Sequence, residues 1–536
     1  MMNGRQHVVF DWLARDQQLS VSSTSQRSGR QRAKMFHSRA TTTRPLDKFD
    51  TPPSSDYKLF NLKGAPPKVA YFKQLLTTIS NLGATGVLIE WEDMFPFKGD
   101  LSRIVNKNAY TEVEVITILD YAQLLELEII PLVQTLAHME WILKTEEYAQ
   151  LREDERYPMV ACIGDEESLN VILDSVNQLM EVHSKFGSRY VHIGADEAFQ
   201  VGVCEADKQV LPVKYQNDTL RLIFDHLTKV SKNISNTFPG TKVLVWYDEL
   251  KSAPLDLIEQ YGLRDNLIPV VWKYTANLDN DLPPEMWSNL SRSFGEVWGG
   301  SAFKGADGAS RYWNRLKPYI LNNKEWYLQN EKYKPLFTTF DSIIVTGWQR
   351  YDHFASLCEL LPTSMISLAL NIIVLTKFHI DVDSTNQVMQ ALDCPTSTTL
   401  DQLVSGSDRC RYPGYKVRDA IRDFVQLKAF FENSTWVHNR ENGWLQPSHM
   451  RLAASNPYYI DAIGKAYERT LKKLDSVMDS LRSSFNEIFY PDVIEEFMED
   501  YVWPMYNDLQ KRKTIVDTID TKKSYSPRPW FTFPGS

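Results

Sequence analysis

Two adjacent carboxylates are the side chains of this chain best suited to acid–base chemistry. Asp196 and Glu197 follow the apolar run 190–193 and two small residues. Neighbouring side chains on an extended segment point to opposite sides, so the two acids are expected to have different tasks. Adjacent acids elsewhere, such as Glu153 and Asp154, fit a solvated surface. The apolar run before Asp196 indicates instead a loop at the end of a buried strand, where catalytic groups are common.

The elements that must position these acids are short apolar strands alternating with amphipathic helices. Strands are expected at 57–63, 86–92, 128–134, 189–195, 242–248, 267–274, 294–298 and 342–348. Helices are clearest at 68–82, 112–127, 168–186, 214–237 and 354–378. Eight alternating strands predict an α/β fold, a (β/α)8 TIM barrel, with an open doubly wound sheet as the competitor. No GxGxxG or P-loop follows the first strand, which disfavours the open sheet. In a barrel, Asp196 and Glu197 lie at the mouth.

Tryptophan recurs near five of the expected strand ends, at Trp91, Trp246, Trp272, Trp298 and Trp348. A single tryptophan at such a position is explained by packing. Several of them beside two acids predict an aromatic box around a sugar ring, because aromatic faces can stack on sugars as well as pack in a core.

The regions that flank the barrel carry no motif with a chemical role. Residues 1–55 are rich in Ser, Thr, Arg and Gln, which predicts a disordered tail. The catalytic barrel is assigned to 56–384. Residues 385–536 are predicted to be mostly helical, clearest at 400–431 and 458–520, with a kink or break at Trp503 and Pro504. This region is expected to pack on the barrel or to form an oligomer contact, such as that of a homodimer.

Charge, hydropathy and cysteine pattern exclude several kinds of function. The net charge of −9 and the lack of a basic stripe argue against nucleic-acid binding. The most apolar run, 365–375, is too short to span a membrane, and the N-terminus lacks a signal-peptide apolar run. The histidines are not spaced as metal ligands, so no metal or cofactor is expected. Five scattered cysteines without a CxxC predict free thiols in a reducing compartment: Cys162, Cys204, Cys358, Cys394 and Cys410.

Several motifs, ordered along the chain, resemble glycoside hydrolase family 20, the β-N-acetylhexosaminidases. The sequence HIGADE at 192–197 is similar to the Asp-Glu signature of the family. Motifs at 62–69, 89–97, 129–144, 301–308 and 346–362 resemble one branch of it, whose enzymes are nucleocytoplasmic. The resemblance spans about residues 57–380. It implies exo-hydrolysis of terminal GalNAc or GlcNAc β-linkages in glycans, and a cytoplasmic and nuclear location.

The resemblance also implies substrate-assisted catalysis with retention, in which the 2-acetamido oxygen of the sugar attacks C1. Glu197 would act as the general acid and then as the base, which calls for a raised pKa. Asp196 would orient the acetamido group. Substrate-binding residues carried over from the family motifs are His138, Trp246, Trp272 and Trp348, and Trp298 is added because it occupies the strand-seven position near which the family usually has a Tyr. Where the usual family residues are missing, the substitutes are Lys63, Tyr274, Arg350 and Asp352.

Two other functions remain open at this stage. The first is a two-carboxylate retaining glycosidase, with Glu197 as the acid and a residue such as Glu249 as the nucleophile. The second is a barrel that binds sugar without catalysis, although the presence of both Asp196 and Glu197 argues against it.

Overall fold

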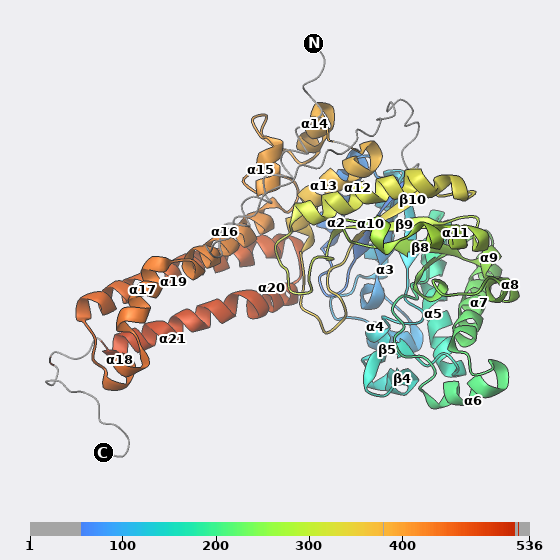
Figure 1. The fold of residues 1–536 in the computed structure, drawn as a ribbon, viewed down its shortest axis with the longest axis horizontal. Helices are drawn as coiled ribbons and strands as arrows, with labels where there is room; N and C mark the ends of the chain where they lie inside the picture. Colours follow the sequence, from blue (N-terminus) through green and yellow to red (C-terminus); the bar gives the residue numbers. More distant parts are fainter. Residues whose placement is uncertain (1–54, 379, 520–523, 525–536) are drawn as a thin grey trace, which may run out of the picture.

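Eight parallel strands form a closed barrel in the computed structural model, which describes residues 55–378, 380–519 and 524 (Figure 1). Residues 1–54 of the expected N-terminal tail therefore lie outside the described residues, and Ser55 begins β1. Neighbouring strands follow the order β1-β10-β9-β8-β7-β6-β3-β2. The strands are β1 (Ser55–Asn61), β2 (Gly86–Glu90), β3 (Glu128–Leu132), β6 (Tyr190–His192), β7 (Lys242–Trp246), β8 (Ile268–Trp272), β9 (Trp298–Lys304) and β10 (Ser342–Gly347). The predicted TIM barrel is confirmed.

One strand lies elsewhere than the sequence predicts. A strand at 294–298 would end at Trp298, whereas β9 begins at that residue. The next two residues of β9 are glycines. Their low strand propensity makes this strand difficult to recognise from the sequence. Both glycines allow close packing, because a Cβ on Gly299 would lie 2.9 Å from the Trp326 ring and one on Gly300 would lie 2.8 Å from Trp272 Cβ. Trp298 consequently lies at the end of the barrel opposite the mouth.

A helix follows each strand and covers the outside of the barrel (Figure 1). The main ones are α2 (Val69–Asn81), α3 (Glu112–Leu124), α5 (Glu166–His183), α7 (Thr219–Thr237), α8 (Leu255–Gln260), α11 (Pro284–Ser293), α12 (Leu316–Tyr333) and α13 (Met365–Lys377). The helix start of α3 is a capping box between Thr111 and Glu114. The helix expected at 354–378 begins only at Met365, after the 3-10 turn Leu361–Ser364 that contains Pro362.

A small antiparallel hairpin, which the sequence did not predict, follows β3. Its strands are β4 (Arg152–Asp154) and β5 (Tyr157–Ala161). The hairpin supports the loop after β3, because Met139 N donates to Met159 O at 2.9 Å and Ala161 N donates to Leu136 O at 3.0 Å. A short helix, α4 (Glu140–Leu143), continues from that loop.

The expectation of free thiols is wrong for four of the five cysteines. Cys162 forms a disulfide with Cys204, and Cys394 forms one with Cys410. Cys358 is a buried free cysteine. The paired residues are 42 and 16 positions apart in the chain, and the fold brings them together. Disulfide partners depend on tertiary structure and cannot be deduced from spacing alone.

The C-terminal helices predicted from the sequence are confirmed. They are α14 (Val382–Ala391), α15 (Leu400–Ser405), α16 (Tyr415–Glu432), α17 (Thr435–Trp444), α18 (Pro447–Leu452), α19 (Pro457–Ile488), α20 (Pro491–Phe497) and α21 (Trp503–Ile519). Helices α16, α17, α19 and α21 extend away from the barrel, whereas α20 lies beside it (Figure 1). The hydrophobic core continues from the barrel into this region, and Tyr412 Oη donates to Pro362 O at 3.0 Å.

The long helix expected at 458–520 is interrupted twice. It ends at Ile488, before Pro491, and a π-helical turn over Met498–Val502 joins α20 to α21. Pro504 has no N–H to donate, and the widened turn directly precedes it, as the predicted kink near Trp503 requires. None of the helices in the described part of the chain has the length and apolarity that a membrane crossing needs.

Candidate active site

A cavity of about 760 Å³, its mouth included, opens at the C-terminal ends of the barrel strands. It is lined by Lys63, Glu90, Gln134, His138, Asp196, Glu197, Trp246, Trp272, Tyr274, Gly305, Ala306, Trp348, Arg350 and Tyr351. The structure thus brings together every site residue predicted from the sequence except Trp298 and Asp352.

These two residues, and Trp91, have positions outside the cavity. Trp298 stacks on Tyr57 inside the barrel with ring centroids 4.8 Å apart. The Asp352 carboxylate accepts hydrogen bonds from the backbone of the two residues 354 and 355, at 2.7 and 2.9 Å, and so stabilises a turn. Trp91 is buried, and its Nε1 donates to His183 Nε2 at 3.0 Å. The expected roles of Trp298 and Asp352 in substrate binding are not supported.

An abrupt turn after β6 places the two acids. Gly194, Ala195 and Glu197 have φ of 67°, 66° and 53°, in the left-handed region. Such conformations are costly for residues other than glycine and persist where the surroundings hold them. Gln134 does so here, because its Oε1 accepts from Ala195 N at 3.3 Å and its Nε2 donates to Asp196 Oδ1 at 3.3 Å. The turn therefore fixes the backbone of both carboxylates.

His138 connects the two acids. Its Nε2 lies 3.5 Å from Asp196 Oδ2 and 3.4 Å from Glu197 Oε2. Burial by itself would lower the pKa of His138, but the two carboxylates outweigh burial and raise the pKa to about 9. The imidazole is therefore charged at neutral pH, and the site contains a cation between two acids.

The pKa of Glu197 differs in direction from the expectation. The hydrogen bond from His138 lowers the pKa of Glu197, whereas burial raises that of Asp196. The sequence suggested burial of Glu197 among tryptophans beside an aspartate. The structure instead adds a cationic imidazole and leaves 40% of the Glu197 side chain exposed. The hydrogen bond from His138 therefore favours an ionised Glu197.

Aromatic rings form one wall of the cavity. The ring centroids of Trp246 and Trp348 lie 6.1 Å apart, and those of Trp272 and Tyr274 lie 5.2 Å apart. Hydrogen bonds fix two of the rings: Trp348 Nε1 donates to Tyr274 Oη at 3.0 Å, and Trp272 Nε1 donates to Asp248 Oδ2 at 2.6 Å. An apolar wall with fixed rings suits the flat face of a small cyclic ligand.

Glu90 and Gln134 are cavity residues that the sequence analysis did not select. Glu90 accepts from Asn61 Nδ2 at 2.5 Å, and burial raises the pKa of its carboxyl to about 7. Nearby, Lys63 pairs with Glu92 at 3.1 Å. Glu90 ends β2, and Gln134 follows β3, so testing every strand end in the same way would have found both. Gly305 and Ala306 follow β9, which was expected to end at Trp298 but ends at Lys304.

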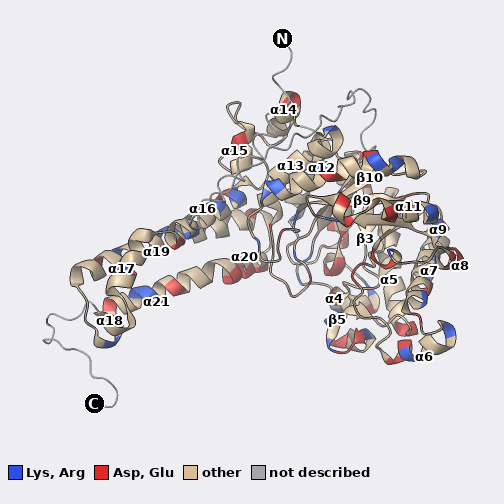
Figure 2. Ribbon diagram, viewed as in Figure 1, with Lys and Arg blue, Asp and Glu red and all other residues tan. Residues whose placement is uncertain are grey.

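Arg350 connects the cavity wall to the C-terminal helices. Its guanidinium donates to Ala355 O at 2.9 Å and to Glu496 Oε2 at 2.7 Å. Glu496 belongs to α20, which carries several acidic residues beside the barrel (Figure 2). Gly64 leaves space for Arg350, since a Cβ there would lie 2.1 Å from Nη2. A residue outside the barrel thus positions one side of the cavity.

The sequence of this chain is similar to those of known glycoside hydrolases. Residues 71–282 match the family model for "Glycosyl hydrolase family 20, catalytic domain". Hexosaminidase D of Homo sapiens is 34% identical over 456 residues, which cover 84% of this chain and 92% of that protein. Hexosaminidase D of Bos taurus is 40% identical over 310 residues, 58% of this chain and 88% of that protein. Both relatives carry the name of the branch that the motifs resemble.

Solved structures also include similar chains. A β-N-acetylhexosaminidase from Bacteroides fragilis is 16% identical and has a TM-score of 0.46, with 64% of this chain and 70% of that chain covered.

The packing of Gly194 against Gln134 gives the first prediction. A Cβ on Gly194 would lie 1.8 Å from Gln134 Oε1, whereas one on Gly187 would meet nothing within 4 Å. The two glycines have φ of 67° and 72°, so the backbone strain of an alanine is nearly equal. Gly194→Ala is therefore expected to lower the free energy of unfolding by about 1–3 kcal/mol more than Gly187→Ala, in urea titrations. Equal losses would show that Gln134 does not hold the turn.

Proposed function

Because this chain belongs to glycosyl hydrolase family 20 and is a β-N-acetylhexosaminidase, we propose that it removes terminal non-reducing GalNAc or GlcNAc from β-linked glycans with retention. The nucleophile in this proposal is the 2-acetamido oxygen of the substrate. The observation that carries the proposal is the pair Asp196 and Glu197 in a cavity with a tryptophan wall, with a charged His138 between them.

In the proposed reaction, the acetamido oxygen attacks C1 while Glu197, reacting in the protonated form that the hydrogen bond from His138 disfavours, gives its proton to the leaving glycosidic oxygen. Asp196 accepts a hydrogen bond from the acetamido N–H and stabilises the positive charge of the oxazolinium intermediate. Glu197, now ionised, removes a proton from the water that attacks C1. Two inversions at C1 give net retention. Trp246, Trp272 and Trp348 pack around the acetamido group and the sugar ring.

The closed base of the cavity supports attack at chain ends. Below the cavity, the barrel interior is filled by a buried cluster that includes Leu59, Ile130 and Trp298. A ligand can therefore enter from the mouth, and a single terminal sugar can reach Asp196 and Glu197. The closed base agrees with attack at a chain end, whereas the choice of exo-hydrolysis itself comes from the family to which the chain belongs.

The position of Glu249 weighs against the two-carboxylate alternative. Glu249 does not line the cavity, and its carboxylate accepts a hydrogen bond from the backbone of Ala198. A nucleophile must lie within reach of C1 in the same cavity as the acid. The match to a glycoside hydrolase family weighs against the alternative of sugar binding without catalysis.

The proposed location comes from the family resemblance, and the proposed assembly from the composition of the site. We propose the cytoplasm and nucleus, on the resemblance to a nucleocytoplasmic branch; the two disulfides count against a permanently reducing compartment. All residues named for the reaction come from one chain, so the proposed chemistry does not require a homodimer.

Substitution of the two acids tests the assigned roles. Glu197→Gln removes the transferable proton, so kcat for p-nitrophenyl N-acetylhexosaminides should fall by about 10²–10⁴-fold while the product sugar still binds. Asp196→Asn should lower kcat by about 10²-fold or more, because the intermediate loses its countercharge. Glu249→Gln is the matched control and should retain near-normal kcat. Loss of activity in the control, or near-normal rates in the first two, would contradict the assignment.

The charge on His138 gives a pH prediction. The imidazolium lowers the pKa of both Glu197 and Asp196. In His138→Gln both carboxyl pKa values rise, so both limbs of the bell-shaped profile of kcat/KM should move to higher pH. The sign does not depend on which acid controls which limb. A profile that changes in height but not in position would show that His138 is uncharged or not coupled to the acids.

The Arg350–Glu496 contact predicts an effect of the C-terminal helices on substrate binding. In Glu496→Gln, Arg350 loses its charged partner, and KM should rise by about tenfold with a smaller change in kcat. Glu495→Gln is the matched control, because Glu495 is exposed and lies 3.6 Å from Arg482, on α19. Equal KM values in the two variants would show that α20 does not position the cavity wall.

A further inference from the structure

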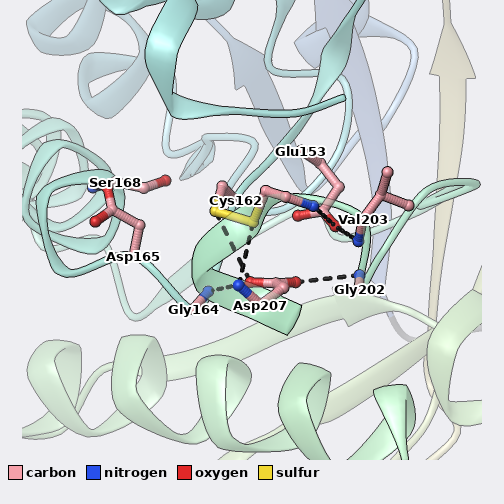
Figure 3. The surroundings of a disulfide bond; sticks show 9 residues. Glu153, Cys162, Gly164, Asp165, Ser168, Gly202, Val203 and Asp207 are labelled. Atoms are coloured by element: carbon pink, nitrogen blue, oxygen red, sulfur yellow. Dashed lines mark hydrogen bonds between the residues drawn. A yellow bond between two sulfur atoms is a disulfide. The ribbon is translucent and has the colours of Figure 1, made fainter. Parts of the chain in front are cut away.

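Two cysteines and two acids gather outside the cavity, between the β4–β5 hairpin and helix α6 (Glu205–Lys214) (Figure 3). Glu153 lies in β4, Cys162 follows β5, Cys204 caps α6 and Asp207 lies in its first turn. One possible ligand atom from each residue lies within 4.8 Å of all the others. Glu153 was expected on a solvated surface, but only 1% of it is exposed, and Asp207 is fully buried.

The Glu153 carboxylate is only half satisfied. Its Oε1 accepts from the backbone N–H groups of Val203 and Cys204, whereas its Oε2 is buried and accepts no hydrogen bond from an N–H group. The Glu153 and Asp207 carboxyl groups lie close enough to share a proton, and burial together with this neighbour raises the pKa of Glu153 to about 7. A buried carboxylate oxygen without a partner is costly, and such groups are usually hydrogen-bonded, paired with a charge or bound to a metal. A cation bound between the two acids would partner this oxygen and replace the shared proton.

Asp207 brings a second carboxylate to the same place. It accepts from Gly164 N at 2.6 Å and from Gly202 N at 3.1 Å, one bond to each oxygen (Figure 3). Each carboxylate oxygen still has a lone pair available for a cation. The backbone N–H groups stabilise negative charge, which a site of four anionic ligands requires.

We propose that reduction of the Cys162–Cys204 disulfide converts these four side chains into a binding site for one Zn²⁺ ion. Two thiol molecules of the glutathione class supply the two electrons and two protons, and they leave as their own disulfide. Zn²⁺ then displaces the two cysteine protons and binds two thiolates and two carboxylates. Thiolate ligands favour Zn²⁺ over Ca²⁺ or Mg²⁺.

The distances allow a tetrahedral site. Zn–S bonds of about 2.3 Å and Zn–O bonds of about 2.0–2.2 Å place tetrahedral ligand atoms roughly 3.3–3.8 Å apart. The four atoms already lie within 4.8 Å of one another. The sulfur atoms must separate once their bond is broken, and the carboxylates need only small shifts.

Both the disulfide and the ion would brace the catalytic loops. The chain from Glu197 reaches Cys204 through a short loop, and β5 supports the segment that carries His138 through the bonds of Met139 and Ala161. His138 and Glu197 lie 3.4 Å apart. In an oxidising compartment the disulfide would therefore link the hairpin to α6. In a reducing compartment the bound Zn²⁺ would link them instead.

Cobalt binding tests this inference without any measurement of catalysis. The full chain, reduced with a phosphine, is titrated with Co²⁺ and then Zn²⁺, and the thiolate-to-cobalt charge-transfer absorption is followed. We expect one equivalent of Co²⁺ per reduced chain, displaced by Zn²⁺, and no such band in the oxidised protein. Absence of the band in the reduced protein would overturn the proposal.

Variants separate this site from the other cysteines. Cys162→Ser with Cys204→Ser should abolish the band, whereas Cys394→Ser with Cys410→Ser, the matched control, should retain it. Glu153→Gln and Asp207→Asn keep both thiols and should weaken Co²⁺ binding by at least tenfold, so they decide the matter if the cysteine variant fails to fold. Unchanged affinity in both, or a band that persists without Cys162 and Cys204, would contradict the site.

Thermal unfolding gives a second readout. A chelator should lower the Tm of the reduced, zinc-loaded protein and leave that of the oxidised protein unchanged, because only the former depends on the ion. A chelator effect of equal size in both states would exclude the assigned ligands.

Discussion

The proposed chemistry depends on one local constraint, the turn between β6 and Glu197. The strand pairs over only three residues, and the backbone then passes through left-handed conformations at Gly194, Ala195 and Glu197. The Gln134 amide makes this path tolerable by bonding both the backbone of the turn and the Asp196 carboxylate. The Gln134 side chain comes from the end of the neighbouring strand β3. The position of the Asp196 carboxylate therefore depends on the pairing of β3 with β6 in the closed barrel.

The remaining parts of the site are arranged around that turn. His138 provides a cation on one side, and it too has a positive φ of 53°, supported by the hairpin behind it. The aromatic wall provides an apolar surface on the other side. Asp248 and Tyr274 hold the tryptophans, and Glu496 holds Arg350. Residues that do not react therefore determine where the reacting ones lie, and one of them comes from the C-terminal helices.

The sequence predicted the barrel and the position of Asp196 and Glu197 at its mouth, because strands of apolar residues and an Asp-Glu motif are local signals. The predicted position of β9 was wrong, because its glycines have low strand propensity and occur there to allow close packing. That error put Trp298 at the mouth. The disulfides, the lowered pKa of Glu197 and the Arg350–Glu496 contact were also missed. Each depends on residues distant in the chain, such as His138 beside Glu197, so no local pattern contains them.

The central claim is that the nucleophile belongs to the substrate, and that Asp196 orients it and stabilises the charge it acquires without itself attacking C1. The most direct measurement is kcat/KM for aryl N-acetylhexosaminides that carry none, one, two or three fluorine atoms on the acetamido methyl group. Fluorine makes the carbonyl oxygen less nucleophilic, so the account predicts a steep fall with each fluorine added. Rates that stay level across the series would contradict it, because an enzyme carboxylate attacking C1 does not depend on that oxygen.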